Sequence, residues 1–273
     1  MEKPVISKHI FRVTNKAYIT PHYIRVKLKT EEKTSFDECT LGANNKIFIP
    51  PHGTKEVTFA SFDKERSEWM MPDESIKPIV RTYTHRAIDN LTNEISIDFI
   101  NHGDNGPASA WAKTAEKGDQ LGVAMKIRET RHYPEVDWYL LVGDATAIPV
   151  ISCILESLPP QAKGRCIIEV FGKEDIHPEV KHPGFQIQWL FNPQPETGSD
   201  LPQMVKQTTL PINGSTFAYV ACEYSSVKEL RNYFTQDLQW TNKDFYAFSY
   251  WKAGVSEEKS AKERREEKRL EKE

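Results

Sequence analysis

Long apolar stretches are absent from this 273-residue sequence. None approaches the roughly 18 apolar residues that a membrane-spanning helix needs. The opening residues, MEKPVISKHIFRVTNK, contain neither the apolar core nor the small-residue cleavage site of a secretory signal. We therefore expect a cytoplasmic protein that does not insert into a membrane.

Closely spaced cysteines are also absent. The four cysteines form no CxxC pair and are expected to be free, mostly buried thiols: Cys39, Cys153, Cys166 and Cys222. A cysteine-ligated iron–sulfur cluster is not expected, because such clusters need thiolates close together. The histidines show no ligand spacing such as HxxxH, so no resident metal is predicted. His85, His132 and His177 are expected, like the others, at the surface or in turns.

An excess of either charge is missing too. The sequence has 36 lysines and arginines against 39 aspartates and glutamates, which gives a formal net charge of −3. A general nucleic-acid binder carries an excess of basic residues, so this class is disfavoured. Any cationic site must therefore be local. The length allows one large domain or two ordinary ones.

The first half of the sequence consists of short segments in which apolar and polar residues alternate. This alternation predicts strands at FRVTNKAYITPHYIRVKLKT, NKIFIPP, EVTFASF, IVRTYTHRAI and EISIDFINH. Several strands at such close spacing indicate an antiparallel barrel or sandwich.

After about residue 132, strands alternate with helices. Strands are predicted at WYLLVGD, CIIEVFG, FQIQWLF, STFAYVACE and DFYAFSYW, and helices at ATAIPVISCILESL and SVKELRNYFTQDL. This order indicates βαβ units and a parallel sheet. We therefore expect one domain over residues 1–132 and a second over 133–254.

A third region, residues 255–273, is a charged helical tail with seven acidic and seven basic residues. A solvated tail of mixed charge is the simpler interpretation. Docking of an electron-transfer partner or of another subunit is the alternative.

Arg81, Tyr83 and Thr84 form the first candidate site, within a predicted strand. Arg81 and Tyr83 share one face, because strand side chains repeat with a period of two. The arginine fork fits phosphate oxygens, and the tyrosine ring offers a stacking surface for a planar heterocycle. The threonine hydroxyl can bond a ring nitrogen. These groups suit a flavin nucleotide, while an exposed strand with ordinary charged positions is the alternative.

The loop after the next strand is the second candidate. Gly103 and Gly106 shape it, and Pro107 falls where a helix would begin. Small residues then leave the first backbone N–H groups of the helix open to an anion. A diphosphate fits there, with Arg81 or Arg86 adding charge, and a well-capped surface helix is the alternative.

The third candidate is the turn Gly143-Asp144-Ala-Thr146, between a buried strand and a helix. Ligands of open parallel sheets bind at such turns. The turn lacks the GxGxxG pattern, so a tight structural turn explains it equally well.

Taken together, RTYTHR, DFINHGDNGPASAWA, GDATAIP, ACEYSSVKELR and SYWKAG resemble the siderophore-interacting protein family of the ferredoxin–NADP reductase superfamily, over about residues 10–254. The resemblance implies a six-stranded antiparallel flavin-binding barrel followed by a Rossmann-like parallel-sheet domain for NAD(P)H. It also implies an oxidoreductase, a ferric-siderophore reductase with non-covalent FAD, whose donor is NAD(P)H or reduced ferredoxin. Iron would be the substrate, and the flavin, with no catalytic side chain, would carry the chemistry.

The resemblance further implies a role for individual residues. Arg81 would contact the diphosphate, Tyr83 would stack on the isoalloxazine, Thr84 would reach its N5 edge, and Glu223 would face the same crevice. The implied cofactor contacts are Arg81, Tyr83, Thr84, Arg86, Asp98, Phe99, Ile100, His102, Asn105, Pro107, Ala108, Ser109 and Thr146. An anionic ferric chelate would be attracted by Lys46, Lys126, Arg128 and Lys252.

Two questions stay open at this point, the electron donor and the type of siderophore. Lys173 favours NADPH by offering a cation to its 2′-phosphate, whereas Glu174 and Asp175 oppose it, and the tail could instead dock a ferredoxin. A flavin or ferredoxin reductase with another acceptor is the nearest alternative function. A non-enzymatic iron-chelate binding protein and a cofactor-free scaffold are the others.

Overall fold

The structure is a computed structural model that describes residues 5–103 and 106–255. Its internal contacts divide the chain into two compact units, Met1–Arg131 and His132–Glu273. Each unit has its own sheet and its own apolar core. No helix in the described ranges is both long and apolar enough to cross a membrane.

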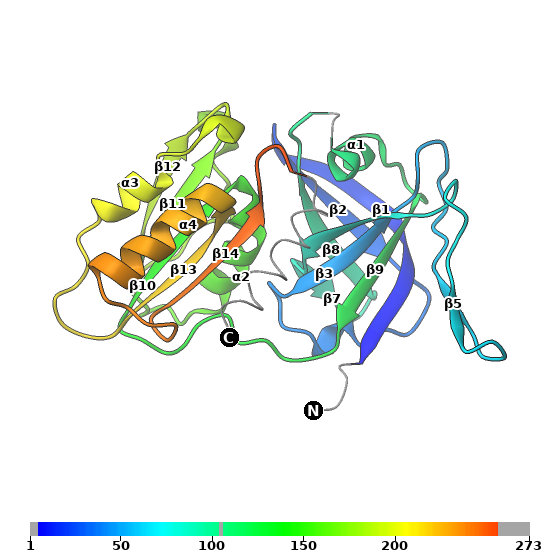
Figure 1. Cartoon of the computed structure of the whole chain (residues 1–273), viewed down its shortest axis with the longest axis horizontal. Coiled ribbons are helices and arrows are strands. Elements are labelled where there is room, and N and C mark those ends of the chain that lie inside the picture. Colours follow the sequence, from blue (N-terminus) through cyan, green and yellow to red (C-terminus); the bar gives the residue numbers. More distant parts are fainter. Residues whose placement is uncertain (1–4, 104–105, 256–273) are drawn as a thin grey trace. The chain divides into compact units, whose positions relative to one another are not determined.

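The first unit is built on a curled antiparallel sheet of seven strands, in the order β6-β3-β9-β1-β2-β8-β7 (Figure 1). The predicted antiparallel barrel-like sheet is confirmed, with one strand more than the six expected, because the three-residue β7 extends its edge. The strands are β1 (Ile6–Thr20), β2 (Tyr23–Lys29), β3 (Asn44–Ile49), β6 (Ile79–Thr84), β7 (Ala87–Asp89), β8 (Glu94–Ile100) and β9 (Gln120–Lys126).

Alternation along these strands places one apolar face inside the barrel. Ile24, Val26 and Leu28 of β2 are fully buried, as are Ile95 and Ile97 of β8 on the neighbouring strand. The helix α1 (Pro107–Thr114) and the short helical turn η1 (Phe36–Glu38) cover this interior with their own apolar residues. The barrel is therefore a packed core whose surface and ends remain for binding.

The predicted strand at EVTFASF is wrong for most of its length. Residues 55–60 have no regular structure, and the chain pairs only in a small hairpin of β4 (Ser61–Asp63) and β5 (Glu68–Met70). The backbone N–H of Val57 donates to the side-chain oxygen of Gln120 at 2.9 Å. A side chain therefore satisfies the buried backbone here in place of a neighbouring strand.

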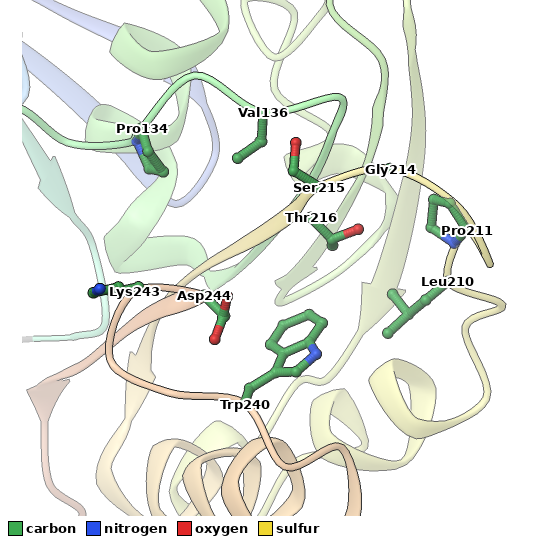
Figure 2. Close-up of a pocket in the computed structure, with 10 residues that line it drawn as sticks. All are labelled: Pro134, Val136, Leu210, Pro211, Gly214, Ser215, Thr216, Trp240, Lys243 and Asp244. Carbon is green, nitrogen blue, oxygen red and sulfur yellow. The ribbon is translucent and has the colours of Figure 1, made fainter.

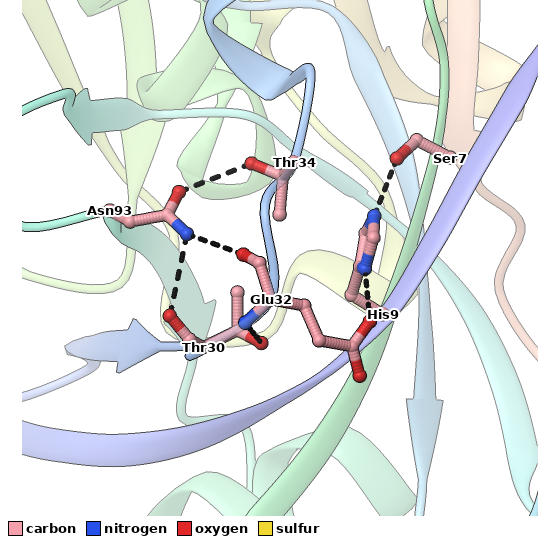
Figure 3. A network of polar contacts seen from close by, with 6 residues as sticks. All are labelled: Ser7, His9, Thr30, Glu32, Thr34 and Asn93. Carbon is pink, nitrogen blue, oxygen red and sulfur yellow. Dashed lines mark hydrogen bonds and ion pairs between the residues drawn. The ribbon is translucent and has the colours of Figure 1, made fainter.

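A polar network joins the start of β1 to the segment after β2 (Figure 3). His9 contacts Ser7 Oγ through Nε2 and Glu32 Oε2 through Nδ1, both at 2.6 Å. Asn93 Nδ2 donates to the carbonyl of Glu32 at 2.8 Å and bonds that of Thr30 as well. Side chains thus fix residues 30–34, which belong to no strand.

The second unit is a parallel sheet of five strands in the order β12-β11-β10-β13-β14. Helices α3 and α4 pack on one face of the sheet and α2 packs on the other (Figure 1). On the α2 face, the missing side chain of Gly143 leaves room for Ile151. This confirms the predicted Rossmann-like domain. Its elements are β10 (Trp138–Asp144), α2 (Ile148–Ser157), β11 (Gly164–Val170), β12 (Phe185–Phe191), α3 (Leu201–Lys206), β13 (Thr216–Glu223), α4 (Tyr224–Asn232) and β14 (Phe245–Trp251).

The structure corrects one prediction about side chains and confirms another. His85 was expected at the surface or in a turn, yet it is 0% exposed and lies in no turn. The His85 ring packs edge-on against the ring of Phe36, with the two centroids 6.2 Å apart. His177 is 2% exposed but does open a turn, as expected, because its carbonyl accepts a hydrogen bond from Val180 N at 3.2 Å. The four cysteines are free and buried, as predicted.

Candidate functional site

Arg81 and Tyr83 lie on the interior-facing side of β6, at the edge of the first sheet. They are paired in register with Ile47 and Asn45 of β3, so the four side chains share one face. Both are partly exposed, and Arg81 Nη1 donates to the carbonyl of Val80 at 2.8 Å. Thr84 is buried on the opposite face of the strand. The structure therefore brings a guanidinium and a tyrosine ring to one edge of the barrel.

Tyr83 belongs to a row of three aromatic rings. Its centroid lies 4.7 Å from that of Phe99 in β8, which in turn lies 5.5 Å from that of Trp111 in α1. Phe99 is fully buried, whereas the other two are partly exposed. The row fixes the orientation of Tyr83, which a stacking surface for a planar ring requires.

Asn45, which the sequence analysis did not select, is a further polar group at this position. It lies opposite Tyr83, is 1% exposed, and neither Nδ2 nor Oδ1 has a hydrogen-bond partner among the described residues. A buried amide without partners is costly, and a bound polar molecule or an ordered water normally satisfies it. The signal in the sequence was a polar residue at an interior position of NNKIFIP, where the alternation calls for an apolar one.

The loop before α1 leads to a helix N-terminus that no described side chain caps. Pro107 begins the helix, and the preceding Gly106 supplies no side-chain cap. A Cβ on Gly106 would lie 2.4 Å from the ring of His102, so only glycine admits this ring. Ser109 is buried and donates to the carbonyl of Gly103 at 2.9 Å, which fixes the loop, and Ala108 is buried beside it. Within the described ranges no side chain caps the first N–H groups of the helix, and such groups can bind an anion. Asn105 lies outside the described residues.

Asp98 of β8 carries a buried ion pair. Arg25 contacts both of its oxygens, at 2.7 and 2.9 Å, and the hydroxyl of Tyr23 donates to it at 2.8 Å. Burial, followed by the charge of Asp98, raises the pKa of Tyr23 well above its usual value. Arg86 is 5% exposed and lies 3.9 Å from the same carboxylate. Of the two predicted phosphate-binding arginines, Arg81 is thus the accessible one.

The first unit fits a flavin nucleotide. Among the described residues, a cation, an oriented ring, a buried amide without a partner and a helix N-terminus without a side-chain cap supply the contacts that its phosphates and ring system need. In addition, β7 pairs with β8 only through Glu94, Ile95 and Ser96. The backbone of Ile97–Ile100 therefore has one strand edge without strand pairing in the described structure.

Two of the predicted substrate-binding cations lie together. Lys46 of β3 is paired with Ala124 of β9, and Lys126 follows two residues later on the same face of β9. Both are exposed, and Lys46 Nζ donates to the hydroxyl of Thr82. Arg128, after the end of β9, is exposed as well.

The second unit places Asp144 and Thr146 at the carboxyl end of β10. Asp144 is 6% exposed and accepts hydrogen bonds from Thr146 N and Oγ1 at 2.9 and 2.5 Å, and from Trp251 Nε1 at 2.7 Å. Burial raises the pKa of Asp144. The two hydrogen bonds from Thr146 to this carboxylate close the turn after β10. Thr146 itself is half-buried at the sheet edge.

Glu169 and Glu223 occupy the ends of the two neighbouring strands. Glu169 is paired in register with Asp144 and accepts hydrogen bonds from Ser199 at 2.7 Å and Asn192 at 3.1 Å. Burial first, and then the charges of Asp144 and Asp200, raise its pKa. Glu223 accepts from the N–H of Ser225 at 2.5 Å and caps α4.

Lys252, the remaining predicted cation, follows β14 in the second unit. Its ammonium lies 4.6 Å above the ring of Tyr224, the first residue of α4. A cation in this position gains a cation–π interaction that holds it beside the carboxyl end of the sheet.

The second unit also has a pocket at the opposite end of its sheet (Figure 2). It surrounds Trp240 and lies before the starts of β10, β13 and β14. The other lining residues are Pro134, Val136, Leu210, Pro211, Gly214, Ser215, Thr216, Lys243 and Asp244. Because ligands of such sheets bind at the carboxyl ends of the strands, this pocket is separate from the predicted site.

Comparisons with known proteins agree with this architecture. The family model described as siderophore-interacting FAD-binding domain matches residues 12–125, and the one described as siderophore-interacting protein matches residues 136–254. The ferric vibriobactin reductase ViuB of Vibrio cholerae is 32% identical over 251 residues, with 91% of each chain covered. The ferric acinetobactin reductase of Acinetobacter baumannii is 26% identical over 183 residues, which cover 66% of this chain and 63% of that one.

Solved structures give the same result for the fold. The siderophore-interacting protein SipS from Aeromonas hydrophila superimposes with a TM-score of 0.79 at 28% identity, covering 95% of this chain and 97% of its own. A ferredoxin NADP⁺ reductase from Neisseria gonorrhoeae with bound FAD and NADP has a TM-score of 0.56 at 12% identity, covering 89% of this chain and 98% of its own. The latter likeness concerns the fold alone. With both family models matched in order and a relative at 32% identity along most of its length, the chain belongs to the siderophore-interacting protein family.

Proposed function

We propose that this protein is an FAD-dependent oxidoreductase that reduces the Fe(III) of a ferric siderophore to Fe(II) and so releases the iron. The observation that carries the proposal is the match of an FAD-binding model to the unit that presents Arg81, Tyr83 and the open end of α1. The 32% identity to a protein named as a ferric vibriobactin reductase supports the substrate class.

FAD is assigned to the first domain, residues 1–132. Arg81 and the N-terminus of α1 hold the diphosphate, and Tyr83, kept in place by Phe99, carries the ring system. Asn45 donates to or accepts from the polar edge of the ring. The other predicted contacts are Thr84, Arg86, Asp98, Ile100, His102, Asn105, Pro107, Ala108, Ser109 and, from the second domain, Thr146.

The residues of the protein bind and orient, and the flavin supplies the chemistry by accepting electrons from a donor and delivering them singly to iron. The cations Lys46, Lys126 and Arg128 raise the local concentration of an anionic chelate. Fe(II) binds hard oxygen ligands more weakly than Fe(III), so the metal leaves the chelate after reduction. Iron is thus substrate, and no resident metal takes part.

The electron donor belongs to the second domain, residues 133–254, whose Rossmann-like sheet suits NAD(P)H. Lys252 stays a predicted contact of the chelate. A reduced ferredoxin as donor, a role for residues 255–273 in its docking, and a location in the cytoplasm remain predictions. Residues 256–273 lie outside the described structure.

Anaerobic flavin spectroscopy tests the proposal. The purified protein is expected to show flavin absorbance bands that bleach on reduction and return when a ferric catecholate is added, with stoichiometric appearance of Fe(II). Reoxidation that does not depend on the ferric chelate would indicate another acceptor. Protein that stays colourless after reconstitution with FAD would contradict the proposal.

A further inference from the structure

The pocket at the amino end of the parallel sheet is a second place in this unit where a small molecule fits (Figure 2). Its volume is about 400 Å³, which lies at the lower end of the range for small-molecule sites. Within the described ranges, its lining includes none of the predicted cofactor or substrate contacts. A ligand bound there would therefore use other residues than the flavin and the ferric chelate.

Trp240 forms the flat wall of this pocket, and the chain holds its ring in place. The residue follows a π-helical turn, η5 (Tyr233–Asp237), and its backbone N–H donates to the carbonyl of Phe234 at 2.8 Å. One face of the ring stacks on buried Phe234, with the centroids 5.1 Å apart and the planes 19° from parallel. Gln239 has a φ of 55°, a left-handed conformation that is unfavourable for a residue with a side chain. The chain thus keeps an unfavourable conformation directly before the ring that lines the pocket.

Four polar groups around this ring have no partner among the described residues. They are the indole N–H of Trp240, the hydroxyl of Thr216, the ammonium of Lys243 and the Oδ1 atom of Asp244. The other oxygen of Asp244 accepts hydrogen bonds from Thr241 N and Oγ1 at 2.7 and 2.8 Å, which fixes the carboxylate. In Figure 2, Asp244 lies at one edge of the indole ring, and the indole nitrogen lies at the other edge. A ligand here meets three donors and one acceptor around an aromatic surface.

The mixture of charges and donors decides the kind of ligand. Lys243 contributes one cation and Asp244 one carboxylate, while the nearby Asp137 is engaged by Ser215 N and Oγ at 2.7 and 2.8 Å. A small cation would leave the donors of the pocket without an acceptor, and a small anion would be repelled by the open oxygen of Asp244. The pocket therefore suits an uncharged planar molecule that both donates and accepts hydrogen bonds.

A catechol ring combines these properties in a small molecule. Its flat ring stacks on an indole, one hydroxyl donates to a carboxylate, and the neighbouring hydroxyl oxygen accepts from an ammonium. When both oxygens bind a metal, they carry no proton to donate, and several such rings around one iron exceed a cavity of this size. The pocket therefore distinguishes an iron-free catechol from a ferric catecholate.

We propose that the Trp240 pocket binds a single iron-free catechol ring, the group that remains when a ferric catecholate has lost its iron. The pocket thus receives the product of the proposed reduction, at residues other than those predicted for the ferric chelate. The link to the product rests on the proposed function, whereas the binding of a catechol does not.

Indole ¹⁵N NMR of the oxidised protein with N-methyl-2,3-dihydroxybenzamide, in metal-free buffer, tests the proposal. The protein has six tryptophans, and the signal of Trp240 is the one that is absent from Trp240→Phe. The probe is expected to shift this signal with a Kd of about 1 mM or lower, and to leave that of Trp251, at the other end of the sheet, in place. N-methyl-2,3-dimethoxybenzamide, which has no hydroxyl protons, should bind at least about fivefold more weakly.

Variants locate the contacts by isothermal titration with the same dihydroxy probe. Asp244→Asn, Lys243→Gln and Trp240→Leu should each raise the Kd several-fold, whereas Trp240→Phe keeps a stacking surface and should change it less. Lys181→Gln is the control for the charge, because it removes an exposed lysine before β12, at the opposite edge of the sheet. It should leave the Kd unchanged.

Equal binding of the dihydroxy and dimethoxy probes would overturn the proposal, as would shifts confined to tryptophans other than Trp240. The gallium(III) complex of the dihydroxy probe should leave the Trp240 signal in place, and a shift by this complex would contradict the preference for a metal-free ring. Catechol binding at Trp240 by a protein that cannot reduce ferric catecholates would contradict the proposed function alone. Reduction of ferric catecholates without catechol binding at Trp240 would contradict this inference alone.

Discussion

Trp251, at the end of β14, donates its indole N–H to the carboxylate of Asp144, at the end of β10, over 2.7 Å. The two residues come from strands separated by β13, and Asp144 is buried. The bond therefore ties the carboxyl edge of the sheet together at the place where the donor is proposed to bind.

Trp251→Phe should lower the free energy of unfolding by about 1–3 kcal/mol, because a buried carboxylate loses a donor. Burial already raises the pKa of Asp144, and loss of the bond raises it further. The loss of stability should therefore be larger at pH 7, where the carboxylate is charged, than at acidic pH, where it is protonated. Chemical denaturation at both pH values measures this. Trp138→Phe removes a similar ring from the start of β10, and an equal pH dependence in that variant would contradict the explanation.

Tyr83 should contribute to flavin affinity through its ring. Tyr83→Ala is expected to raise the Kd for FAD roughly tenfold or more, since stacking of aromatic rings contributes about 0.5–1.5 kcal/mol beyond the buried area. Tyr83→Phe keeps the ring and its contact with Phe99 and should bind nearly as tightly. Fluorescence titration of the flavin-free protein measures both. Equal flavin affinity in the alanine variant and the parent would remove Tyr83 from the site.

Asn45 should affect affinity and stability in opposite directions. Asn45→Val removes a buried amide that has no partner in the described structure, so the flavin-free protein should gain about 1 kcal/mol of stability. The same variant should bind FAD less tightly if the amide contacts the flavin. Thermal unfolding with and without FAD separates the two effects. A variant that gains stability and binds FAD as before would show that Asn45 only bonds an internal water.

His85 makes the barrel sensitive to acid. Burial lowers its pKa from 6.5 to about 4, so the folded protein binds this proton less readily than the unfolded chain does. Its contribution is fully present above pH 6.5 and is lost as the pH falls toward 4, by about 3 kcal/mol in total. His85→Leu should therefore lose less unfolding free energy than the parent when the pH is lowered from 7 to 4.5. Urea denaturation at both pH values measures this, and parallel pH curves would place the acid sensitivity elsewhere.

Lys46 and Lys126 should increase the rate with anionic chelates. The double variant to Gln is expected to raise the KM for a ferric tris-catecholate several-fold and to weaken the dependence of kcat/KM on salt. Neutral ferric chelates should react as before. Lys117→Gln, which removes an exposed cation from another part of the unit, is the control. A KM that stays constant in the double variant, together with an unchanged salt dependence, would rule out the proposed role of these lysines.

The fold was largely predictable because the two sheets follow two different sequence patterns. Alternation located β2, β3 and β8, and the apolar run WYLLVGD gave β10 with its observed ends, Trp138–Asp144. Residues 56–60 were wrongly predicted as a strand because apolar and polar residues alternate there. In the structure the side chain of Gln120, and not a neighbouring strand, satisfies the backbone N–H of Val57. A contact between residues so far apart in sequence is not visible in a local pattern.

The predicted site was less complete for the same reason. Arg81, Tyr83 and the loop before α1 stand out by residue type, but Asn45 becomes notable only once it is seen buried opposite Tyr83. Arg86 looked equivalent to Arg81 in the sequence, and the structure separates them by pairing Arg86 with Asp98. Burial and ion pairing depend on the whole fold, so sequence spacing alone could not rank these groups.

The central claim is that electrons pass from a protein-bound flavin to chelated Fe(III). Its most direct test is anaerobic stopped-flow mixing of the dithionite-reduced holoprotein with a ferric catecholate, following flavin absorbance and trapping Fe(II) with ferrozine. We predict saturable flavin reoxidation, with two Fe(II) formed for each flavin oxidised because the flavin gives up two electrons. Flavin that remains reduced in the presence of excess ferric chelate would contradict the claim.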